Sequence, residues 1–120
     1  MNNRLSKCEE TLFETYFILS YARKVLQNDL NIVQKSLFKL KEPYTQLIHT
    51  SIGQISKELY EVKSQLHKQN IKIEFGTNDG TFTEFHCYFR GYEHTSRYLN
   101  VHLKNKVQAR LCSFFVGETK

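Results

Sequence analysis

The chain has 120 residues, which is long enough to fold as one domain around a hydrophobic core of its own. Apolar residues make up 40% of it, but they occur in short runs, so we expect neither a secretory signal nor a membrane-spanning helix. The net charge of +5 permits binding to nucleic acid or to an anionic surface without requiring it.

The first predicted element is a helix over residues 6–38. Ser6 and Glu9 have the spacing of a capping box, and apolar residues then recur at steps of three and four on one helix face. No glycine or proline interrupts this stretch, although Asn28 and Asp29 could divide it into two helices.

A second helix is predicted over residues 43–68, because proline is tolerated in the first turn of a helix and Pro43 marks that turn. Its apolar residues recur at steps of four and three and form a heptad seam, which consists of Ile48, Ile52, Ile55, Leu59, Val62 and Leu66. The seam suits two structures. We favour an antiparallel hairpin with the first helix, because the connection is short, and the alternative is the interface of a homodimer.

A two-stranded β-hairpin is predicted next, with strands over residues 71–76 and 81–90. Apolar and polar residues alternate in both strands, and the intervening sequence Thr77-Asn78-Asp79-Gly80 has the composition of a tight turn. A lone hairpin is only marginally stable in water, so its apolar face must pack on the helices.

The last element is predicted to be a helix over residues 95–116. Thr95 or Ser96 would cap it, and Gly117 lies where a terminating glycine is expected. The alternative is a second hairpin that begins with a strand through Leu99 and Leu103, but the absence of glycine and proline favours the helix. Its apolar residues lie on two sides, so both sides must be buried inside the fold or against a partner.

The sequence contains no pattern typical of an enzyme. Its five histidines are not spaced as metal ligands, and it has no phosphate-binding glycine loop and no nucleophile motif. Cys8, Cys87 and Cys112 are odd in number and form no CxxC pair, so we expect reduced thiols and a cytoplasmic location. We therefore predict no catalytic residue, no metal site and no cofactor.

Residues 90–110 combine interleaved tyrosines with five basic residues, as nucleic-acid-binding surfaces do. The basic residues are Arg90, Arg97, Lys104, Lys106 and Arg110. On a helix that turns by about 100° per residue, Lys106 and Arg110 fall opposite Arg97 and Lys104, so the charges form no single stripe. A basic nucleic-acid-binding regulator is therefore the alternative function and not the favoured one.

The segment that joins the hairpin to the last helix holds the candidate interaction residues. These are Arg90, Tyr92, Arg97, Tyr98, Asn100 and Lys104. Such side chains either connect a hairpin to a helix through hydrogen bonds or anchor a protein interface, and the sequence supports both interpretations.

Two stretches carry a resemblance to a known family. They are FKLKEPYTQLI, from Phe38 to Ile48, and TEFHCYFRGYEHTSRYLN, from Thr83 to Asn100, and they resemble the YhjD-like proteins, which are small Firmicute proteins. The resemblance covers about residues 38–115. It implies a bacterial cytosolic protein and transfers no catalytic residue.

We therefore predict a single domain over residues 1–120 of mainly α (α+β) class, with a long helical hairpin, a two-stranded β-hairpin and a C-terminal helix. The expected function is that of a non-enzymatic interaction or regulatory protein. Its expected partner is another protein or a second copy of itself, associating through helices, and we expect no membrane partner.

Overall fold

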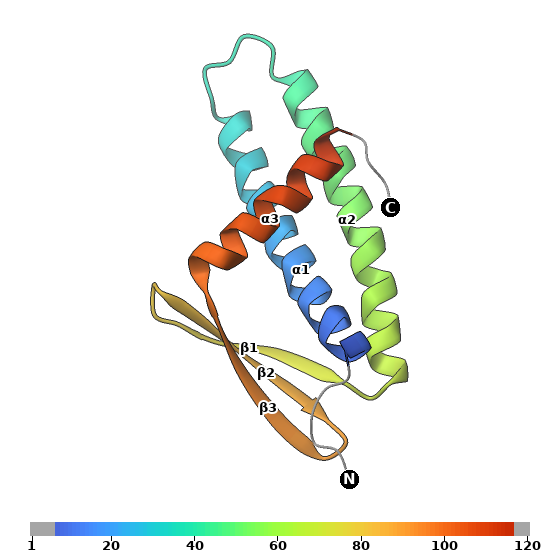
Figure 1. Ribbon diagram of the computed structural model, residues 1–120. Coiled ribbons are helices and arrows are strands. Elements are labelled where there is room, and N and C mark those ends of the chain that lie inside the picture. The colour runs from blue at the N-terminus through green and yellow to red at the C-terminus, as the bar shows by residue number, and fades with distance from the viewer. Residues whose placement is uncertain (1–6, 117–120) are drawn as a thin grey trace.

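The computed structural model describes residues 7–116, which fold into three helices and a three-stranded antiparallel sheet (Figure 1). The helices are α1 (Lys7–Gln34), α2 (Glu42–Lys68) and α3 (Asn100–Phe115), and the strands are β1 (Lys72–Asn78), β2 (Phe82–Phe89) and β3 (Tyr92–Leu99). The α+β class and the long helical hairpin are confirmed. The predicted cap at Ser6 and the predicted end signal at Gly117 lie outside the described residues.

The helices α1 and α2 run antiparallel, and α3 crosses them (Figure 1). Helix α1 ends at Gln34 and not at residue 38, because the Ser36 hydroxyl donates to the Val33 carbonyl oxygen (2.6 Å) and closes the last turn. Leu37 and Phe38 consequently lie in the loop to α2. Asn28 and Asp29 do not interrupt α1.

The sheet has the order β1-β2-β3, so β2 is its central strand. The predicted turn before β2 is present: Gly80 has a φ of 94°, and its amide donates to the Asn78 Oδ1 atom (2.9 Å). Gly76 and Thr77 interrupt the regular pairing of β1 with β2 between Phe75 and Asn78, as a β-bulge does.

The prediction of only two strands, followed by a helix from residue 95, is wrong for Tyr92–Leu99, which form β3. Arg90 and Gly91 both have positive φ, of 49° and 78°, which is the conformation that a two-residue hairpin turn requires. Thr95 and Ser96 pair with β2 and do not cap a helix. The last helix is present from Asn100, and the second hairpin through Leu99 and Leu103 does not form.

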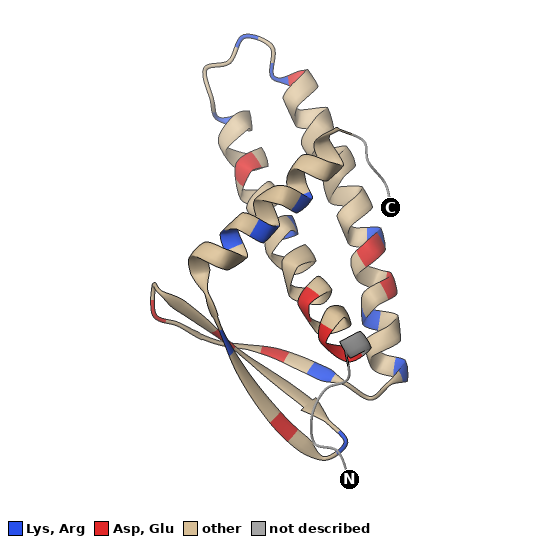
Figure 2. Ribbon diagram, viewed as in Figure 1, with Lys and Arg blue, Asp and Glu red and all other residues tan. Residues whose placement is uncertain are grey.

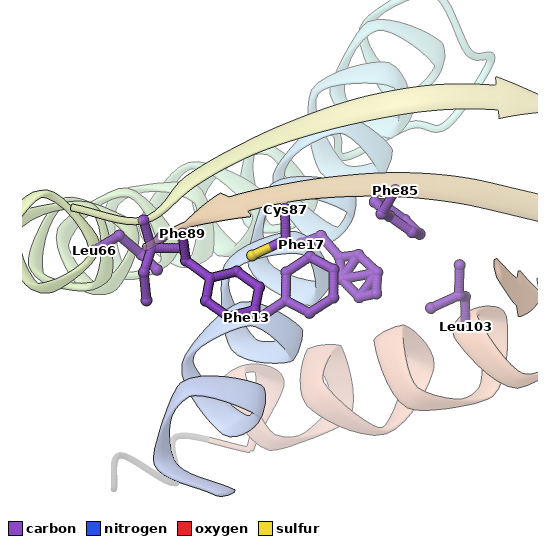
Figure 3. Packing of buried hydrophobic residues seen from close by; sticks show 8 residues of the cluster. Phe13, Phe17, Leu66, Phe85, Cys87, Phe89 and Leu103 are labelled. Atoms are coloured by element: carbon purple, nitrogen blue, oxygen red, sulfur yellow. The ribbon is translucent and has the colours of Figure 1, made fainter. Parts of the chain in front are cut away.

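The core consists of two clusters of buried residues. Figure 3 shows the cluster next to the sheet, which comprises Phe13, Phe17, Leu66, Ile71, Phe85, Cys87, Phe89 and Leu103. The second cluster lies among the three helices and comprises Leu19, Ala22, Leu26, Ile48, Ile55, Leu59, Val107 and Phe114. Helix α1 supplies residues to both clusters, and Tyr16 and Val62 pack against both of them.

The heptad seam of α2 faces the interior of its own chain. Ile48, Ile55, Leu59 and Leu66 are buried, and Ile52 and Val62 pack against the core clusters. The seam therefore packs inside the helical hairpin, as favoured from the sequence. A homodimer through the same residues would have to displace this intrachain packing.

Two glycines give a matched pair of stability predictions. A Cβ atom on Gly76 would lie 2.9 Å from His86 Nε2 and 3.1 Å from the Glu84 carbonyl oxygen, whereas a Cβ on Gly53, inside α2, meets nothing within 4 Å. We expect Gly76→Ala to lower the free energy of unfolding by about 1–2 kcal/mol and Gly53→Ala to raise it by roughly 0.5–1 kcal/mol. Urea denaturation of both variants measures this, and equal effects of one sign would contradict it.

Candidate interaction surfaces

The residues predicted for interaction lie along β3 and the start of α3, and most of them hold the fold together. Tyr98 packs in the sheet-side core, with its ring centroid 5.0 Å from that of Phe17. Arg90 pairs with Glu9 of α1 across 3.0 Å, and Arg97 lies over the Phe82 ring, 4.5 Å from its centroid. These three side chains therefore have structural partners inside the chain.

Asn100 connects the β1–β2 turn to the first residue of α3. Its Nδ2 group donates to Asn78 Oδ1 (3.0 Å), its Oδ1 atom accepts from the Thr83 hydroxyl, and its backbone amide donates to the Thr81 carbonyl oxygen (2.8 Å). The hydroxyl of Thr83 is buried. Asp79 holds the same turn, because its carboxylate accepts from the amides of Phe82 and Thr81, and these bonds lower the pKa of Asp79.

Four of the five basic residues between positions 90 and 110 have a carboxylate within 4 Å. The pairs are Arg90 with Glu9, Arg97 with Asp79, Lys106 with Glu14 and Arg110 with Glu58. Lys104 has no carboxylate within that distance among the described residues. Figure 2 shows that α3 carries basic residues, whereas acidic residues lie on α1 and α2. This intramolecular neutralisation weakens the region as a phosphate-binding surface.

An apolar groove lies between α1 and α3, with a volume of about 430 Å³. Tyr21 and Val25 line it from α1, and Leu103, Val107 and Leu111 line it from α3. Asn100, Lys104 and Gln108 supply polar groups to the same groove. Of the predicted interaction residues, the structure thus brings Asn100 and Lys104 together at a concave surface.

A second apolar surface lies at the end of the helical hairpin that is farthest from the sheet (Figure 1). We call it the distal patch, and it consists of Ile32, Leu37, Phe38, Leu40, Tyr44, Leu47 and Phe115, all of which are exposed. Four of these residues, Ile32, Tyr44, Leu47 and Phe115, border a cavity of about 260 Å³.

Neither apolar surface was assigned from the sequence. The signal for the groove was present in the apolar residues on two sides of the last helix, but a helical pattern does not say which neighbour covers which side. The distal patch could not be predicted, because the helical pattern includes Leu37 and Phe38 in the first helix and Leu40 lies between the two predicted helices.

No group of three or more histidine, cysteine, aspartate or glutamate side chains is placed to hold a metal ion among residues that the structure describes. Burial, aided by the nearby Glu9 carboxylate, raises the pKa of the Cys87 thiol to about 11, so this thiol is protonated and unreactive near pH 7. Cys112 is exposed and is not disulfide-bonded. Within residues 7–116, no helix has the length and apolar character needed to cross a membrane.

The comparisons with known proteins extend the resemblance seen in the sequence. A family model described as YhjD protein matches residues 4–119. A protein of Bacillus subtilis (strain 168) named "Uncharacterized protein YhjD" is 35% identical over 100 residues, which cover 83% of this chain and 83% of that protein. No solved structure matches the chain.

Proposed function

The chain belongs to the YhjD family, and from its own surface we propose that it is a non-enzymatic protein that binds an amphipathic helix of a partner in the groove between α1 and α3. The observation that carries the proposal is the apolar lining of this groove, where Tyr21, Val25 and Leu111 leave a concave surface unfilled within the chain. The bacterial relative and the free thiols of Cys87 and Cys112 support a cytosolic setting for it.

The shape of the groove favours a helix as its occupant. Its two walls are helices, and its apolar residues on α3 follow each other at four-residue steps from Leu103 to Val107 to Leu111. Apolar side chains spaced by three and four residues on a partner helix would fit between such rows.

The charge at the groove favours an acidic partner. Lys104 lines the groove and has no carboxylate within 4 Å among the described residues, whereas Lys106 and Arg110 on the same helix are paired with Glu14 and Glu58. A carboxylate beside the apolar face of the partner helix would form an ion pair with Lys104, which has none among the described residues.

Nucleic-acid binding through residues 90–110 is less well supported. Three basic residues of this region already form ion pairs with carboxylates of α1 or α2; these are Arg90, Lys106 and Arg110. Phosphate contacts would therefore have to displace existing ion pairs. The described residues also offer no metal-ligand cluster that would favour a metalloenzyme.

A library of helical peptides displayed on phage tests the groove directly. We expect selected peptides to carry apolar residues at three- and four-residue spacing next to at least one carboxylate. Leu111→Glu should weaken their binding by about tenfold or more, because it places a charge in the apolar groove. Lys104→Glu should weaken it by roughly threefold to tenfold, because it replaces the positive charge at the groove with a negative one. Isothermal titration of purified variants provides the affinities.

Tyr60→Glu serves as the matched control, because Tyr60 is an exposed apolar residue on α2 outside this groove. Its affinity for the selected peptides should equal that of the unmodified protein. Peptides that bind equally well to Leu111→Glu and Tyr60→Glu would place binding elsewhere and contradict the proposal.

A further inference from the structure

The loop between α1 and α2 presents apolar side chains directly to solvent. Leu37 is 101% exposed and Leu40 is 74% exposed, while the Phe38 ring rests on Tyr44 with centroids 5.4 Å apart. Exposed apolar side chains that cluster in this way are uncommon on proteins without a partner and mark interaction sites.

The same loop is positively charged. Lys35, Lys39 and Lys41 alternate with the apolar residues, and the sequence has no aspartate or glutamate from residue 30 to residue 41. Figure 2 shows these basic positions along the loop. The Lys41 ammonium donates to the Gln34 carbonyl oxygen (3.0 Å), which holds its charge at the base of the loop.

We infer that this loop binds the surface of an anionic lipid bilayer, with Leu37, Phe38 and Leu40 in the headgroup region and the lysines against lipid phosphates. Short apolar segments flanked by lysine bind such surfaces because apolar burial and attraction to anionic lipid act together. This inference departs from the sequence-based expectation of no membrane partner, which rested on the absence of a long apolar run; a surface-bound loop needs no such run.

The position of the loop favours a bilayer over a second copy of the chain. It lies at one end of a molecule that is 60 Å long, so it can meet a flat surface without interference from α3 or the sheet (Figure 1). A two-fold dimer through the same loop would bring the three lysines of one copy against those of the other, which is unfavourable.

Sedimentation with vesicles of phosphatidylcholine that contain increasing phosphatidylglycerol tests the inference. The bound fraction should rise with phosphatidylglycerol content. Leu37→Ser/Leu40→Ser should weaken binding by about tenfold or more, because both apolar side chains are lost. Lys35→Gln/Lys39→Gln should weaken it by roughly fivefold for each lysine.

Two controls separate the loop from the general positive charge of the protein. Lys63→Gln/Lys68→Gln removes the same charge near the C-terminus of α2, and Tyr60→Ser removes an exposed apolar side chain from the middle of that helix. Both should bind vesicles nearly as well as the unmodified protein.

Three results would overturn the inference. They are no binding at any phosphatidylglycerol content, equal losses for the loop variants and their controls, and a dimer in light scattering that Leu37→Ser/Leu40→Ser converts to a monomer. The last result would assign the loop to self-association. None of these results bears on the groove between α1 and α3, whose peptide binding is measured without lipid.

Discussion

Phe17→Ala is expected to lower the free energy of unfolding by about 3–5 kcal/mol, which is the largest effect of any single substitution considered for this chain. The Phe17 side chain is 0% exposed and lies where α1 meets the sheet. Its ring packs against Phe13, with centroids 5.2 Å apart, against Tyr98, with centroids 5.0 Å apart, and against Phe85. Alanine would leave a cavity between a helix and two strands that cannot easily close.

Urea denaturation followed by circular dichroism measures the effect. Phe17→Leu should lose less, about 1–1.5 kcal/mol, because it keeps most of the buried volume. Tyr60→Ala, at a residue that is 75% exposed, should change stability by no more than about 0.5 kcal/mol. A loss below about 1 kcal/mol for Phe17→Ala would show that the aromatic cluster does not pack as described.

Asn100→Ala is the second substitution with a large expected effect, about 2–3 kcal/mol of lost stability. The side chain of Asn100 accepts from the Thr83 hydroxyl and donates to Asn78 Oδ1. Without it, the Thr83 hydroxyl is left buried with no acceptor, and α3 loses a connection to the β1–β2 turn.

A double-mutant cycle with Thr83→Val isolates the shared hydrogen bond. We expect a coupling of about 1 kcal/mol or more, because valine removes the hydroxyl that alanine at position 100 leaves unpaired. Asn105→Ala provides the control, since Asn105 is an exposed asparagine on the same helix. Strictly additive losses for Asn100→Ala and Thr83→Val would mean that the two side chains are not bonded to each other.

The helical hairpin and the first two strands were predictable because each has a strong local pattern. The seam from Ile48 to Leu66 repeats over the whole of α2, and Thr77-Asn78-Asp79-Gly80 is a recognisable turn between alternating strands. A periodic pattern shows which face of an element is buried. The apolar face of α2 was therefore sufficient to predict that α2 packs on α1.

The third strand was not predictable in the same way. Asn-Gly and Asp-Gly are the strong signals for a two-residue hairpin turn, whereas Arg90 adopts positive φ here in spite of its side chain. Along β3, Ser96 and Tyr98 lie on the inner face but only Tyr98 is a large apolar residue, so the alternation is weak. The sheet partner, β2, decides the structure of this segment, and a single-sequence pattern does not contain that partner.

The candidate surfaces likewise combine residues that the sequence indicates with contacts that only the folded chain supplies. The sequence indicated Arg90, Asn100 and Lys104 as interaction residues. Their separate contacts depend on Glu9, on Thr83 and on the groove, to which other elements contribute. The distal patch depends on where α1 ends, and one turn of helix more or less decides whether Leu37 is packed or exposed.

The continuity of α1 has a mechanical consequence. One unbroken helix of 28 residues takes part in both core clusters, and through them it joins the loop at one end of the molecule to the sheet at the other. A bend between the helical hairpin and the sheet would therefore have to disrupt α1 or one of the two clusters. A surface that held the loop would therefore also orient the sheet at the other end of α1, because both are joined through the same packed helix.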